Sequence, residues 1–98
     1  MIIEHLTVAI PAGTQAAFIA HDAAVWTATL SRQPGFIGKE TWAEASDPTR
    51  IHLIIRWETR AQWKSISPDL LAATDRRMEA AFGHPVPVLS CADCEVIG

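Results

Sequence analysis

The tripeptide Gln33-Pro34-Gly35 is the feature that most limits how this chain can fold. Proline has no backbone N–H and disfavours helical geometry at the residue before it, so a helix arriving from the N-terminal side must end at Gln33. Gly35 accepts the positive φ that a reversal of the chain requires. The residues from Phe36 to Trp42 then alternate in the manner of a strand. The sequence therefore predicts a change from helix to sheet at this point.

The segments on either side complete a pattern of two helical regions and four strands. Strands are expected at Ile2–Ile10, Phe36–Ala45, Arg50–Trp57 and Val86–Ile97. Helices are expected at Thr14–Arg32 and from Thr59 onward, with an interruption and restart at Pro68 and an end at Gly83. The order β-α-β-β-α-β with right-handed crossovers predicts one α+β ferredoxin-like domain over residues 1–98. Its antiparallel sheet has the strand order 4-1-3-2, with both helices on one side.

Local signals support these boundaries. Thr59 to Gln62 fits a capping box, and Ser67-Pro68-Asp69 combines an N-cap, a proline at the first helical position and an acid in the first turn. Ser46 to Thr49 is predicted to be a tight turn in which Asp47 bonds back to the backbone. In the first helix an apolar sector is expected to be buried: Phe18, Ile19, Ala23, Val25, Trp26, Thr29 and Leu30.

Composition excludes several classes of function. The net charge of −3, without a basic run, gives no electrostatic footprint for nucleic acid. No apolar stretch approaches the roughly 20 residues of a membrane span, and the first residues lack the features of a secretion signal, so a cytoplasmic protein is expected. Cys91 and Cys94 are three apart in an extended segment and are interpreted as reduced structural thiols. Neither a metal site nor another cofactor site is predicted.

A second copy of the chain is the expected partner. If both helices cover one face of the sheet, the other face carries Ile3, Ile54 and Trp42, which a monomer would expose. A homodimer that buries more than roughly 1,000 Å² is therefore predicted. His5 and His52 lie on neighbouring strands of the same face, where they are expected to be solvated or hydrogen-bonded to one another.

The arrangement of these motifs resembles the antibiotic biosynthesis monooxygenase domain of the dimeric α/β-barrel superfamily. The resemblance rests on Pro34-Gly35-Phe36 after an amphipathic helix, a strand ending at Trp42, and Trp57-Glu58-Thr59 before the next helix. The segments Asp22–Thr27 and Ile55–Trp57 are similar to those of a small bacterial subgroup.

The resemblance implies a dimeric α/β barrel, in which two sheets pack face to face and a pocket lies between sheet and helices. Members oxidise aromatic polyketides without metal or flavin, or degrade haem; the superfamily also holds isomerases and proteins without a demonstrated reaction. The family's site residues are combinations of Asn, Trp and Tyr or of Asn, Trp and His. This sequence contains neither Asn nor Tyr, so only the tryptophans can be carried over, as pocket-lining residues.

Asp22 is the candidate catalytic residue, because its neighbours on the helix face are Phe18, Val25 and Trp26. A carboxylate there must find donors or meet a cation, and Arg56 and Arg77 are the partners considered. In a pocket, Asp22→Asn is expected to leave stability close to unchanged or to raise it, while abolishing any turnover. In an ion pair, it is expected to cost roughly 3 kcal/mol or more.

Two functions are compatible with this pattern. The first is a cofactor-independent enzyme acting on a small aromatic or polyketide-like molecule, with Asp22 as base and a binding site formed by Trp26, Trp63, Phe18 and Arg56. The alternative is a non-catalytic small-ligand-binding or regulatory dimer whose pocket is filled by side chains. A cavity of roughly 300 Å³ or more beside Asp22, with convergent polar groups, would favour the enzyme, and a dry, filled space there would favour the alternative.

Overall fold

A computed structural model describes residues 1–98 and confirms the predicted order of elements. The strands are β1 (Ile2–Ala9), β2 (Phe36–Glu44), β3 (Asp47–Trp57) and β4 (Val88–Glu95). The first helical region is continuous and consists of α1 (Gln15–Asp22), the π-helical turn η1 (Ala23–Thr27) and α2 (Ala28–Leu30). The second region contains α3 (Arg60–Lys64) and α4 (Pro68–Phe82). None of the helices is long and apolar enough to cross a membrane.

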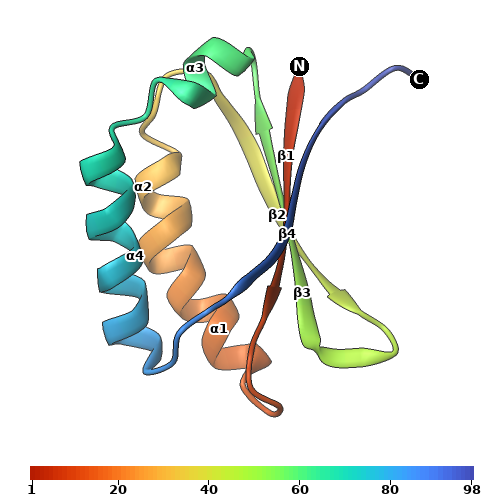
Figure 1. Cartoon of the computed structure of the whole chain (residues 1–98), viewed down its shortest axis with the longest axis vertical. Helices are drawn as coiled ribbons and strands as arrows, with labels where there is room; N and C mark the ends of the chain where they lie inside the picture. The colour runs from red at the N-terminus through yellow and green to blue at the C-terminus, as the bar shows by residue number, and fades with distance from the viewer.

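The four strands form one antiparallel sheet in the order β2-β3-β1-β4, which is the predicted order read from the other edge. Both helical regions lie on one face of this sheet, and no element covers the other face (Figure 1). The fold is therefore α+β and ferredoxin-like. β1 and β3 lie at the centre of the sheet, so their helix-facing side chains form its core.

The expected helix signals are present. The Thr59 side chain accepts a hydrogen bond from the Gln62 amide, and the Ser67 side chain caps α4 at the Leu70 amide. Gly83 ends α4 with a φ of 83°, a left-handed conformation that glycine adopts without a Cβ penalty.

The hairpin between β2 and β3 is tighter than predicted. β3 begins at Asp47, which pairs with Glu44, so the reversal takes place at Ala45 and Ser46. Asp47 does bond back to the backbone, because its Oδ1 accepts the Thr49 amide at 2.9 Å. The Thr49 side-chain and backbone hydrogen bonds lower the pKa of the Asp47 carboxyl.

The buried face of the first helical region also differs from the expectation. Phe18 and Leu30 are buried as predicted, but Ile19 is 51% exposed and Ala23 also faces solvent. The cause is the π turn, in which the Ala28 amide donates to the carbonyl of Ala23, five residues back. One turn therefore contains an additional residue, and the helix face that follows is rotated relative to an uninterrupted α-helix.

The uncovered sheet face is polar at its centre and apolar at one edge. His5 Nε2 and His52 Nδ1 are 2.9 Å apart, so of the two arrangements expected from the sequence the structure has the hydrogen-bonded one. His52 Nε2 also contacts Glu44 Oε1 at 2.9 Å. Trp42 is 48% exposed on this face, whereas Ile54 is buried, contrary to the prediction. Ile54 is paired with His5 on β1 and with Glu40 on β2, so the side chains of the adjacent strands already cover Ile54.

Candidate functional site

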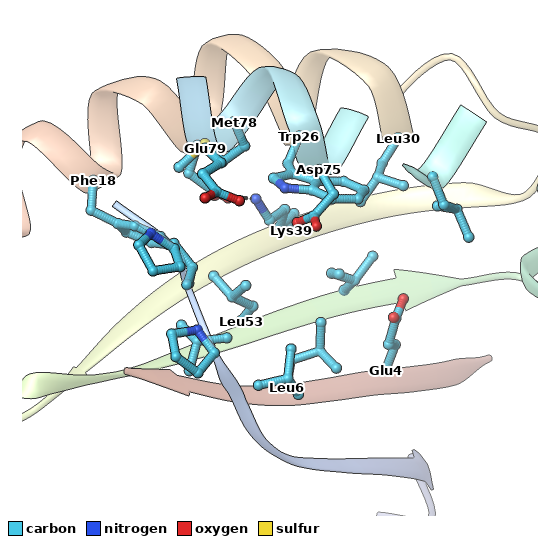
Figure 2. Close-up of a pocket in the computed structure, with 18 of the residues that line it drawn as sticks. Glu4, Leu6, Phe18, Trp26, Leu30, Lys39, Leu53, Asp75, Met78 and Glu79 are labelled. Carbon is cyan, nitrogen blue, oxygen red and sulfur yellow. Dashed lines mark hydrogen bonds and ion pairs between the residues drawn. The ribbon is translucent and has the colours of Figure 1, made fainter. Parts of the chain in front are cut away.

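A cavity of about 390 Å³ lies between the helix-covered face of the sheet and the helices. Its walls are mainly apolar side chains from β1, β3, the first helical region and α4, and the segment before β4 contributes to them as well. The ionisable residues in its lining are Glu4, Asp22, Lys39, Asp75, Glu79 and His84. Figure 2 shows Glu4 on the sheet side of the cavity and Lys39 close to the helices. Typical ligand pockets have volumes of roughly 300 Å³ or more, and this cavity is larger than that lower limit.

Asp22 lies in the wall of this cavity and pairs with Lys39 of β2. The two side chains are only 3% and 2% exposed, respectively. Lys39 Nζ donates a hydrogen bond to Asp22 Oδ2. It donates a second hydrogen bond to Thr27 Oγ1, at a distance of 2.9 Å. Asp22 Oδ1 is buried and has no hydrogen-bond partner. A buried carboxylate oxygen without a donor is unusual, and Asp22 is one of the residues that line the cavity.

The partners considered for Asp22 from the sequence were wrong. Arg56 lies on the uncovered face of the sheet, where it forms an ion pair with Glu40. Arg77 donates to Thr29 Oγ1 at 3.0 Å. Neither arginine lines the cavity. Arg56 is excluded by strand alternation, since its neighbours Ile55 and Trp57 point into the core.

The three aromatic residues expected at the site all line the cavity. Phe18 is 1% exposed and meets Phe82 edge to face, with ring centroids 5.6 Å apart. Trp26 is half-buried and packs against both parts of the core. Trp63 comes from α3, and Lys64 Nζ lies 4.0 Å from its ring centroid. The aromatic surfaces therefore come from three different elements and can hold a flat apolar molecule.

Glu4 is a second carboxylate at the cavity that the sequence analysis did not select. It accepts a hydrogen bond from Trp57 Nε1 at 3.2 Å. Burial raises the pKa of Glu4 above its ordinary value, and the Trp57 hydrogen bond and the Lys64 charge oppose the increase only in part. The sequence does indicate that Glu4 faces the core, because Glu4 lies between Ile2 and Leu6 on one apolar face of the strand.

Lys39 is the second residue that was missed, and strand alternation could have found it. Trp42 was placed on the uncovered face, and Lys39 is three residues earlier, so Lys39 must face the helices. A lysine beneath a helix needs a carboxylate, and Asp22 is the acid on the buried side of that helix.

The arrangement combines an apolar cavity with several carboxylates and with Lys39, which is paired with one of them, Asp22. Carboxylates can act as general bases when they lie within hydrogen-bond reach of a bound ligand. No three His, Cys, Asp or Glu side chains converge closely enough to hold a metal ion. Cys91 and Cys94 are both free and exposed on β4.

Comparisons with known proteins agree with this architecture. The sequence profile of the family described as antibiotic biosynthesis monooxygenase matches residues 1–66. A protein of Bordetella bronchiseptica with the same family name aligns at 20% identity and a TM-score of 0.74, over 98% of this chain and 96% of the other. SnoaB, a cofactor-independent oxygenase from Streptomyces nogalater, aligns at 16% identity and a TM-score of 0.72, over 99% and 94% of the two chains. At these identities the structural likeness establishes the fold alone. The comparison with curated proteins gives no match.

Proposed function

Because the chain belongs to the antibiotic biosynthesis monooxygenase family, we propose that its cavity is the active site of a cofactor-independent monooxygenase acting on a small aromatic or polyketide-like molecule. The observation that carries the proposal is the cavity of about 390 Å³ with Asp22 in its wall. A fold like that of SnoaB, a cofactor-independent oxygenase, supports it.

The proposed reaction converts an activated ring CH₂ to a carbonyl. Asp22, in the cavity wall, accepts a proton from the substrate and leaves an electron-rich anion. That anion donates electrons to O₂, one oxygen atom forms the new C=O, and the other leaves as water. The balance is R₂CH₂ + O₂ → R₂CO + H₂O, with O₂ as the oxidant. Phe18, Trp26 and Trp63 hold the flat substrate against the base and exclude water.

The non-catalytic alternative also has one observation in its favour. Asp22 is engaged by Lys39, and an ion pair of this kind can be purely structural. In that case the cavity binds a small aromatic ligand without turnover. The two functions differ in what happens to O₂ when an oxidisable ligand is present.

The test uses anthrone, whose ring CH₂ can be oxidised to give anthraquinone. An oxygen electrode records O₂ uptake and chromatography records anthraquinone, with the spontaneous rate subtracted. The proposal expects equal amounts of O₂ consumed and anthraquinone formed, after dialysis against a chelator. Loss of the base in Asp22→Asn should lower the rate about 100-fold or more. Asp69→Asn, at the start of α4 and outside the cavity, serves as the matched control.

Two results would contradict this proposal. A wild-type rate equal to the spontaneous rate argues for the non-catalytic alternative. A rate in Asp22→Asn equal to that of Asp69→Asn removes Asp22 from the role of base.

We also propose that two copies of the chain associate through the uncovered sheet face, giving the barrel that the family resemblance implies. Trp42, 48% exposed on that face, is the large apolar side chain that such contact would cover. The cavity lies on the opposite, helix-covered face, so each protomer keeps its own site.

A further inference from the structure

Glu4 is the carboxylate that opens into the cavity. It belongs to β1, and Figure 2 shows its carboxyl group pointing from the sheet toward the helices. Its Oε1 accepts the hydrogen bond from Trp57 Nε1. Its Oε2 has no hydrogen-bond partner, and the only fully buried side-chain oxygen without a partner is Asp22 Oδ1. The second oxygen of Glu4 can therefore be reached from the cavity that this residue lines.

The charges around the cavity favour a positively charged ligand. Glu4, Asp75 and Glu79 line the cavity and form no ion pair. The one lysine in the lining, Lys39, is already held by a carboxylate. Lys64 is a second cation near Glu4, but its side chain is exposed and solvent screens its charge. A ligand anion would therefore be repelled from the cavity, whereas a ligand cation would be attracted.

The burial of Glu4 prepares it for such a charge. Burial raises the pKa of its carboxyl, because the ionised form has lost part of its hydration. This loss has already taken place in the folded protein, so a cation that binds there gives up only its own hydration. Trp63 lines the same cavity, and Lys64 Nζ lies 4.0 Å from its ring centroid, so the indole already attracts a cation on one face. A carboxylate beside an indole suits an ammonium group joined to a flat ring.

We propose that Glu4 is the cation-binding residue of this cavity and that the ligand carries an alkylammonium group attached to an aromatic ring. The ammonium group donates a hydrogen bond to Glu4 Oε2, and the ring lies among the apolar side chains of the lining. No covalent bond forms or breaks in this step. The inference rests on the proposed function, because it assigns a charged group to the substrate of the same site. In that reaction the ammonium group offsets the negative charge that forms on the substrate.

The test compares three naphthalene derivatives of different charge. At pH 7, 2-naphthylmethylamine is a cation, 2-naphthalenemethanol is its neutral counterpart and 2-naphthoate is an anion. Isothermal titration calorimetry at low salt measures the Kd of each with the wild-type protein. The amine is expected to bind about tenfold or more tightly than the alcohol. The reason is that a cation beside a carboxylate shifts its ionisation by about one pKa unit or more, and one unit is a factor of ten.

Two variants make the result specific. Glu4→Gln keeps the size of the side chain and an oxygen for the Trp57 hydrogen bond, but it removes the charge. This variant should bind the amine no more tightly than the alcohol, and it should bind the alcohol as the wild type does. Glu58→Gln makes the same change at an exposed residue outside the cavity and should keep the full preference for the amine. Thermal unfolding checks that both variants are folded.

Three outcomes would overturn the inference: no preference of the wild-type protein for the amine over the alcohol, a preference that is retained in Glu4→Gln, or tighter binding of 2-naphthoate than of the alcohol. The outcome is separable from that of the anthrone assay. A preference for the amine without O₂ uptake refutes the monooxygenase and leaves Glu4 as the cation-binding residue. Turnover of anthrone without a preference that depends on Glu4 does the reverse.

Discussion

Replacing Asp22 by asparagine tests the buried ion pair directly. The amide has nearly the shape of the carboxylate but no charge, so Lys39 keeps its position and loses its counter-charge. Both side chains are at most 3% exposed, and solvent can do little to compensate. Thr27 still accepts one hydrogen bond from Lys39, at 2.9 Å.

The magnitude follows from this burial. Removing one partner of a buried pair costs about 3–5 kcal/mol, and the remaining Thr27 contact places the expectation near the lower value, about 3 kcal/mol. For a domain of 60–100 residues, 1 kcal/mol shifts the unfolding midpoint by about 4–8 °C. Asp22→Asn should therefore unfold about 12–24 °C below the wild type. The double variant Asp22→Asn/Lys39→Met should recover at least about 2 kcal/mol.

Thermal and urea unfolding at one fixed protein concentration provide the measurement. Asp75→Asn is the matched control, since Asp75 also lines the cavity but is exposed and forms no ion pair. Its midpoint should stay within about 4 °C of the wild type. If Asp22→Asn behaves like Asp75→Asn, the ion pair does not stabilise the fold and the reasoning fails. A large loss does not by itself argue against catalysis, because Asp22 lies in an ion pair and in a cavity wall at once.

Three further predictions concern other parts of the chain. Burial raises the pKa of Glu4 above 4.5, so the folded state holds this proton more tightly and stability falls as the pH rises from below 4.5 through the folded value. Glu4→Gln should remove that fall and be more stable than the wild type at pH 7; equal pH profiles in urea unfolding would contradict it. Gly35 has a φ of 85°, and an added Cβ would lie 2.4 Å from Gln62 Oε1, so Gly35→Ala should cost about 2 kcal/mol. In a Gln62→Gly background, which also removes the Gln62 Cβ that would lie 2.7 Å from the added methyl group, the cost should fall to about 1 kcal/mol, and an undiminished cost would show that the contact does not matter. Trp42→Glu should convert a dimer of twice 10.7 kDa to a monomer in light scattering, whereas Ile19→Glu, on the exposed helix surface, should not; a monomeric wild type would refute the association.

Much of the fold was predictable because its determinants are local. Pro34-Gly35 ended the first helix and opened β2. Ser67 and Gly83 fixed both ends of α4, since capping depends on residues within a few positions of one another. Strand alternation then assigned the sheet faces. These signals needed no knowledge of the rest of the chain.

The π turn was not predictable in this way. Its residues, Ala23 to Thr27, include no glycine or proline that would indicate a departure from α-helical geometry. The contacts that accompany it come from Lys39, which is 17 residues from Asp22 and 12 from Thr27. A projection at 100° per residue therefore placed Ile19 and Ala23 in the core, where the structure exposes them.

The candidate site was predictable only in part, because only some of its determinants are local. Asp22 and the aromatic residues were selected from patterns within single elements, and all of them line the cavity. The cation was misassigned to Arg56 or Arg77, because the choice between basic residues depends on which strand crosses beneath the helix. That information belongs to the tertiary fold, and here β2 brings Lys39 to Asp22.

The position of the ion pair also bears on function. Two buried charges can usually be replaced by apolar residues of similar volume without loss of stability, and often with a gain of about 1–4 kcal/mol. Phe18 is part of the apolar core, Trp26 packs against it, and both line the same cavity as the pair, so the core does not require charges at this place. Yet the pair is present, it faces a cavity, and it leaves one N–H of Lys39 and one oxygen of Asp22 without a partner. A purely structural pair would be expected to use these groups within the protein. A stabilising role alone therefore leaves the unpartnered Oδ1 of Asp22 unexplained.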